Sequence, residues 1–83
     1  MAITYILFSK TLDRYYIGST EQSMEERLKK HLTNHSGFTG RAKDWEIVLV
    51  QNFGTKSEAY ALERSLKALK SRKALEKYIL DQA

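Results

Sequence analysis

The segment Ile3–Phe8 is apolar on both of its alternating faces. Its odd positions carry Ile, Tyr and Leu, and its even positions carry Thr, Ile and Phe. Successive side chains of a strand point to opposite faces, so a strand with two apolar faces must be covered on both sides. We therefore expect this segment to be the central strand of a small sheet, with helices packed against both faces.

Turn and capping signals predict the other elements. The polar stretch 10–14 turns the chain into a second strand, so that the first two strands form a hairpin. Capping boxes begin at Ser23 and Thr55, and each opens a helix. We expect strands over residues 3–8, 15–20 and 45–53 and helices over residues 23–33, 55–70 and 71–79. This ββαβαα order is typical of an α+β fold with a three-stranded antiparallel sheet flanked by helices.

Length and composition restrict the class of protein. With 83 residues, the chain allows a single domain, residues 1–83. Because it has no cysteine, disulfide scaffolds, thiolate zinc sites and cysteine nucleophiles are excluded. No segment approaches the ~20 apolar residues of a membrane span, and residues 2–8 lack the basic leader of a signal peptide. We expect a cytoplasmic protein without a membrane partner.

Positive charge is concentrated near the end of the chain. The net charge is +4, and the window Arg64–Lys77 holds six basic residues and one acidic residue. A localised basic surface indicates a polyanionic partner. A solvated helix face rich in lysine explains the same window equally well, so charge alone leaves both interpretations open.

Helical periodicity places three polar side chains at the edges of apolar faces. At 100° per residue, Arg27 and His31 lie one turn apart, facing the sheet. Glu63 lies beside the apolar arc of the long helix, where a half-buried carboxylate needs a cation or a metal ion. Ordinary packing explains each of them separately: an Arg–carboxylate pair, a histidine at the edge of the core, and a Glu63–Lys67 helix pair.

The predicted hairpin places two tyrosines on the same face of the sheet. A four-residue loop over 11–14 pairs Lys10 with Tyr15 and places Tyr5 and Tyr16 on one face of the sheet. Gly18 then faces the same way and leaves a hollow beside Tyr16. Core packing of the tyrosines and a bulge at the glycine are the alternative interpretation.

Taken together, these residues resemble the GIY-YIG nuclease family, and in particular its small stand-alone, UvrC-like members. The half-motifs stand as Ile3-Thr4-Tyr5, with Ile3 where the family has Gly, and as Tyr16-Ile17-Gly18. Arg27 and His31 match the Arg and His of the following helix, and Glu63 matches the metal-binding Glu. The resemblance covers residues 3 to about 73.

The resemblance implies a divalent-metal-dependent endonuclease that hydrolyses DNA, possible roles being structure-selective cutting in repair or recombination. Glu63 would hold Mg²⁺ or Mn²⁺, Arg27 would clamp the phosphate, and Tyr16 would hold the phosphate or the water. Tyr5 would be the general base, its pKa of ~10 lowered by Arg27, by the metal and by a hydrogen bond to His31.

DNA backbone contacts are expected from basic residues other than Arg27. These residues are Arg41, Lys67, Lys70, Arg72 and Lys73. The loop 34–42, which carries Phe38 and Arg41, is expected to be mobile and to border the site, or else to be a plain surface crossover. The alternative function is a catalytically idle module of the same fold that binds DNA or a partner protein. Since so small a domain has little surface for sequence recognition, its action on DNA is expected to be structure-selective, non-specific, or dependent on a protein partner that supplies specificity.

Overall fold

The computed structural model describes residues 1–33 and 42–82, without the side chains of residues 30–33. Its elements are β1 (Ala2–Ser9), β2 (Arg14–Thr20), α1 (Met24–Thr33), β3 (Glu46–Phe53), α2 (Lys56–Ala68) and α3 (Arg72–Gln82). Their order confirms the predicted ββαβαα arrangement, and the predicted bounds agree within three residues. The α+β fold class is therefore confirmed.

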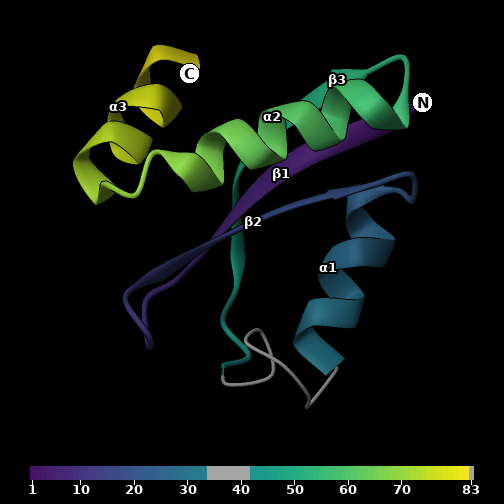
Figure 1. Ribbon diagram of the computed structural model, residues 1–83. Helices are drawn as coiled ribbons and strands as arrows, with labels where there is room; N and C mark the ends of the chain where they lie inside the picture. The colour runs from purple at the N-terminus through teal and green to yellow at the C-terminus, as the bar shows by residue number, and fades with distance from the viewer. Residues whose placement is uncertain (34–41, 83) are drawn as a thin grey trace.

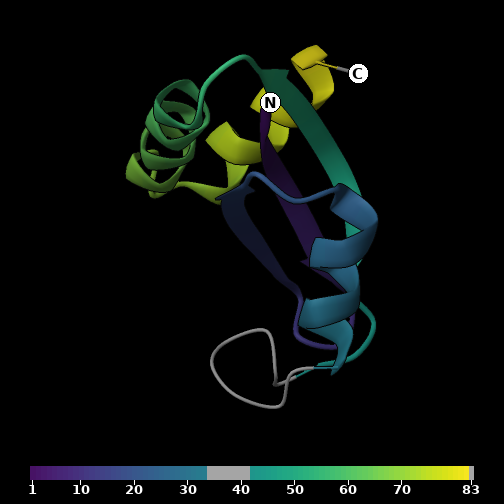
Figure 2. The same ribbon diagram turned by 90° about the vertical axis from the view of Figure 1, so that its right-hand side faces the viewer.

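β1 is the central strand of an antiparallel sheet with the order β2-β1-β3 (Figure 1). Its odd positions pack with Trp45 and with Met24 and Leu28 of α1. On the other face, Ile6 packs with Leu66 of α2 and with α3. Figure 2 shows α1 on one side of the sheet and the other two helices on the opposite side. The two apolar faces of β1 thus explain the three-layer arrangement.

The hairpin register differs from the expected one by two residues. Ser9 pairs with Arg14, and Tyr5 pairs with Gly18, so the prediction that Lys10 pairs with Tyr15 is wrong. Asp13 has a φ of 54°, a left-handed conformation that Asp tolerates better than most residues, and the turn closes there. A shift of two residues leaves every side chain on its face, so the shared face of Tyr5, Tyr16 and Gly18 is confirmed.

Asp44 ties the β1–β2 turn to the segment before β3. Its carboxylate accepts hydrogen bonds from the buried Ser9 Oγ at 2.6 Å and from the Thr11 backbone N–H and Oγ1, both at 2.9 Å. These hydrogen bonds, that of Ser9 first, lower the pKa of Asp44 to about 2. No local pattern in the sequence marks Asp44, because its partners lie more than 30 positions away.

Acid should therefore weaken this connection. A carboxyl group whose pKa is lower in the folded chain stabilises the fold above its unfolded pKa, and that contribution is lost as the pH falls through the folded value. For Asp44 the loss runs from pH 3.8 down to about 2. Asp44→Asn should be less stable than the wild type at pH 7, and the difference should shrink over this interval. Denaturant unfolding between pH 2 and 7 measures it.

The exposed Asp81→Asn serves as the control, and its acid unfolding should follow the wild type. The pKa of Asp13 is also lowered, first by its hydrogen bond to Arg72, so the wild type loses a second contribution in acid. For that reason the test compares the two variants at each pH. A constant difference between Asp44→Asn and wild type from pH 7 to 2 would contradict the role given to Asp44.

Candidate active site

Tyr5 lies directly over a glycine. Gly18 is its partner on β2, and a Cβ atom there would lie 2.5 Å from the Tyr5 hydroxyl oxygen and 2.7 Å from its Cζ. The expected hollow beside Tyr16 is thus occupied by the Tyr5 phenol. The Tyr16 ring lies 6.3 Å from the Tyr5 ring and 6.4 Å from the Trp45 ring, measured between centroids. Only a glycine leaves room for this arrangement.

Helix α1 places Arg27 beside Tyr5. The helix begins after Ser23, whose Oγ accepts a hydrogen bond from the Glu26 N–H, as the capping box predicts. One turn into the helix, Arg27 Nε donates to the Tyr5 hydroxyl at 3.0 Å. This hydrogen bond, opposed by burial and assisted by Tyr16, raises the pKa of the guanidinium. The result is a half-buried, permanently charged group held at a fixed position on the face that carries both tyrosines.

Glu63 approaches β2 from the opposite face of the sheet. Its side chain is 13% exposed, and Lys67 Nζ lies 2.7 Å from its Oε2. Its Oε1 accepts a hydrogen bond from Ser19 Oγ at 2.5 Å. The Glu63–Lys67 helix pair is therefore confirmed, whereas Ser19 was missed. Strand alternation could have indicated it, since Ser19 follows Gly18 and must face the other way.

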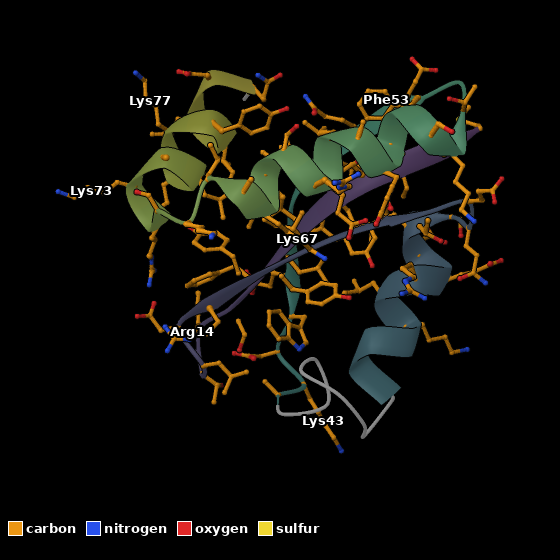
Figure 3. The ribbon with its side chains drawn as sticks, in the orientation of Figure 1. Arg14, Lys43, Phe53, Lys67, Lys73 and Lys77 are labelled. Atoms are coloured by element: carbon orange, nitrogen blue, oxygen red, sulfur yellow. The ribbon has the colours of Figure 1, made fainter. Side chains whose placement is uncertain are left out.

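Arg27 and Glu63 lie on opposite faces of the sheet, beside the edge strand β2. Within the described residues β2 pairs only with β1, so it is an edge strand, and side chains from both faces of the sheet can lie beside it. Burial first, with a smaller contribution from the charge of Glu63, raises the pKa of Tyr5. The hydrogen bond to Glu63 first, with a smaller contribution from Tyr16, raises the pKa of Lys67. Figure 3 shows Lys67 reaching from α2 toward β2. A carboxylate, a guanidinium and two phenols are thereby brought to the two faces of one strand, beside Gly18 and Ser19.

The comparison with protein families agrees with this arrangement. A family model described as the GIY-YIG catalytic domain matches residues 1–82. The chain belongs to the GIY-YIG family. Searches of curated proteins and of solved structures give no match. The GIY-YIG domain is a nuclease domain, so the chain has a nuclease fold and DNA is its implied substrate.

The buried tyrosine of β1, Tyr5, is less acidic than free tyrosine. Tyr5 is 0% exposed, and this burial raises its pKa above 10, while the hydrogen bond and the charge of Arg27 lower it. The predicted effect of Arg27 thus has the expected sign but is smaller than the effect of burial. Tyr5 is therefore a neutral phenol at pH 7, and its hydroxyl accepts the hydrogen bond of Arg27.

Some of the expected site residues lie outside the part of the chain that can be described. The backbone of His31 belongs to α1, but its side chain lies outside the described residues, as do Phe38 and Arg41. The hydrogen bond between His31 and Tyr5 and the mobility of the loop consequently stay predictions.

The basic residues expected to contact DNA are in different situations. Arg72 pairs with Asp13 at 2.8 Å and with Glu76 at 3.4 Å, and it lies over the rings of Phe8 and Tyr15. It therefore stabilises the junction between the hairpin and α3. The others are exposed: Lys67 pairs with Glu63, Lys70 follows α2, and Lys73 points away from the sheet (Figure 3).

A divalent metal fits this GIY-YIG site through one carboxylate. No cluster of three His, Cys, Asp or Glu side chains that could hold a metal occurs among the described residues. Mg²⁺ is commonly bound by one or two carboxylates together with substrate phosphates, which matches a site with Glu63 alone. The Lys67 ammonium group already on Oε2 shows that this carboxylate accepts a cation.

No helix within residues 1–33 and 42–82 is both long and apolar enough to cross a membrane.

Proposed function

We propose that this chain is a divalent-metal-dependent endonuclease that hydrolyses DNA phosphodiester bonds, with structure-selective cutting in repair or recombination. The supporting observation is that Arg27 bonds the Tyr5 hydroxyl over Gly18 and that Glu63 bonds Ser19, so the two side chains lie beside adjacent residues of β2 on its two faces. A phosphate at the edge of this strand would have a guanidinium on one side and a carboxylate on the other. The transition state of phosphodiester cleavage carries added negative charge, which Arg27 and a metal ion held by Glu63 would stabilise.

Arg27 is the phosphate clamp in this proposal. Its Nε donates to Tyr5 and it also hydrogen-bonds Tyr16, and the planar guanidinium, with five N–H groups in all, has further donors for phosphate oxygens. Tyr16, half-buried beside it, has a hydroxyl suited to orient the phosphate or the attacking water. Ser19 holds one oxygen of Glu63 in place. A Mg²⁺ or Mn²⁺ ion bound at Glu63 would supply Lewis-acid stabilisation of the developing charge.

Tyr5 is proposed as the general base that accepts the proton of the attacking water. Because burial raises its pKa above 10, the fraction ionised at neutral pH is small and rises with pH. The cleavage rate should therefore increase about tenfold per pH unit between pH 7 and 9. Tyr5→Phe should remove both the activity and this dependence. Single-turnover rates at fixed saturating metal measure them.

A different outcome would change the role of Tyr5. If Tyr5→Phe keeps the steep pH dependence and loses only part of the rate, Tyr5 positions Arg27 and another group takes the proton. The conservative change Arg27→Lys helps to separate these two roles of Tyr5, proton acceptor or support for Arg27. Lys keeps the positive charge but not the planar guanidinium.

The function itself is tested with a panel of DNAs: single-stranded, duplex, flap, splayed-arm and four-way junction. Each is incubated with Mg²⁺, Mn²⁺ or EDTA. Product that depends on metal and differs among the substrates supports the proposal. Product in EDTA would contradict the metal requirement, and equal cutting of all substrates would contradict the structure selectivity.

A catalytically idle binding module is the second candidate. It is favoured by the Lys67 ammonium group and Ser19, which occupy both oxygens of Glu63. Such a module would bind DNA in a salt-sensitive manner that EDTA leaves unchanged, and it would yield no product with any metal. A protein partner that supplies specificity would then restore cutting when added.

A further inference from the structure

A groove of about 390 Å³ runs along the outer edge of β2, beneath the junction of α2 and α3. It is lined by four consecutive β2 residues, 14–17, and consecutive strand residues face opposite ways. Only a groove that follows the edge itself can contact all four. Tyr16 and Lys67 also line it, and both belong to the surroundings of the candidate active site. The groove is therefore continuous with that site.

The floor of the groove is largely apolar and rigid. It is formed by Tyr15 and Ile17 of β2, together with the surface of the core residues Leu66 and Leu75. The Tyr15 hydroxyl donates to Glu76 Oε2 at 3.0 Å, which holds its ring in place. The Arg72 guanidinium lies 5.5 Å from the centroid of this ring, so the floor consists of aliphatic side chains and a guanidinium plane. Both suit the face of a nucleobase, since bases stack on apolar side chains and on Arg guanidinium planes.

The rim of the groove carries free positive charge. Arg14 and Lys70 line it and are both exposed, and neither has an ion-pair partner within residues 1–33 and 42–82. Lys70 has a φ of 52°, so the chain turns sharply at the end of α2 and brings this residue to the rim. Arg72 also lines the groove, but Asp13 and Glu76 neutralise it. Arg14 and Lys70 are thus suited to phosphate groups.

We propose that this groove is a nucleotide subsite, which receives one unpaired nucleotide of the strand being cut, next to the scissile phosphate. The base lies on the floor, and the adjoining phosphates contact Arg14 and Lys70. A base within a duplex is stacked and paired, so it cannot enter without being flipped out at a cost of a few kcal/mol. The preferred substrate is accordingly DNA with an unpaired nucleotide at the cut, and this inference rests on the proposed nuclease function.

Binding in EDTA tests the subsite without any cleavage. Fluorescence anisotropy compares a single-stranded 12-nucleotide oligonucleotide with the duplex of the same sequence. We expect the single strand to bind about tenfold more tightly, since stacking of one base contributes about 1–3 kcal/mol. Replacing one nucleotide of the single strand by an abasic site at each position in turn should remove this advantage at one position. Equal or tighter binding of the duplex would overturn the proposal.

Variants locate the binding to the groove. Lys70→Asn removes the charge while keeping a residue that tolerates positive φ, and Arg14→Gln removes the second charge. Each should reduce the slope of log affinity against log salt by about 0.7. Lys56→Gln is the matched control, because it removes the same charge from an exposed side chain at the other end of α2 that does not line the groove. If Lys56→Gln reduces the slope as much as Lys70→Asn, the attraction is diffuse and the subsite does not exist.

NMR spectra separate this inference from the nuclease function. Adding the single strand in EDTA should shift the signals of Tyr15 and Ile17, and shifts elsewhere without these would overturn the subsite. If the subsite binds as expected but Mg²⁺ and Mn²⁺ yield no product, only the nuclease proposal fails. If product forms equally well from duplex and single strand, the subsite fails and the nuclease proposal stands.

Discussion

Glu63→Gln should lower the cleavage rate by about 10³-fold or more while leaving the fold intact. The loss corresponds to several kcal/mol of transition-state stabilisation, as expected when the carboxylate that would hold a divalent ion becomes neutral. Gln keeps the shape of the side chain and can still accept from Ser19. The lost ion pair with the exposed Lys67 is worth only about 0.3–0.5 kcal/mol. Single-turnover cleavage and denaturant unfolding of the same samples measure the two effects.

DNA binding gives this prediction a second readout. Removing a negative charge beside the phosphate path should leave the affinity in EDTA unchanged or raise it. Glu46→Gln, an exposed change at the start of β3, should match the wild type in cleavage and in stability. If Glu63→Gln cuts at the wild-type rate, Glu63 does not hold the metal and the site assignment is wrong.

Gly18→Ala should destabilise the protein by about 1–3 kcal/mol, the usual cost of overpacking a core position. The new Cβ would lie 2.5 Å from the Tyr5 hydroxyl oxygen and 2.7 Å from Cζ, and 3.2 Å from Tyr16 Cε1. Tyr5 is buried on β1 and has no open side to move into. A shift of about 4–8 °C in Tm per kcal/mol is expected for a domain of this size.

Cleavage by Gly18→Ala should fall as well, because Tyr5 cannot move off the glycine without disturbing its hydrogen bond with Arg27. Gly54→Ala is the matched control. A Cβ there would meet only Glu58 Oε1 at 3.8 Å, and the φ of Gly54 lies outside the left-handed region. That variant should be neutral or more stable by up to about 1 kcal/mol. Equal stability of the two variants would contradict the close packing of Tyr5 on Gly18.

The local elements of this fold could be read from the sequence because their signals are short-range. The two apolar faces of β1 required a central strand covered on both sides, and the capping boxes at Ser23 and Thr55 placed the starts of two helices. Hairpin parity put Tyr5 and Gly18 on the same face, but the register was two residues off. Parity follows from alternation alone, whereas register depends on which turn residue adopts positive φ, here Asp13.

The candidate site was predicted in part for the same reason. Periodicity put Arg27 and Glu63 at the edges of their helices, and both do reach the sheet. It could not show that Arg72, counted as a free cation, is neutralised by Asp13, 59 positions away. Nor could it find Asp44, whose partners on the β1–β2 turn are distant in sequence.

The sequence by itself determined the type and order of the elements, the face each paired residue of the hairpin occupies, and the edge positions of Arg27 and Glu63 on their helices. These depend on alternation, helical periodicity and capping, which act over a few residues. Only the tertiary structure decided that α1 and α2 lie on opposite faces and that their polar side chains lie beside adjacent residues of β2. It also decided that Ser19 holds Glu63 and that a groove continues from the site. Such contacts join residues tens of positions apart, and the packing of whole elements determines them.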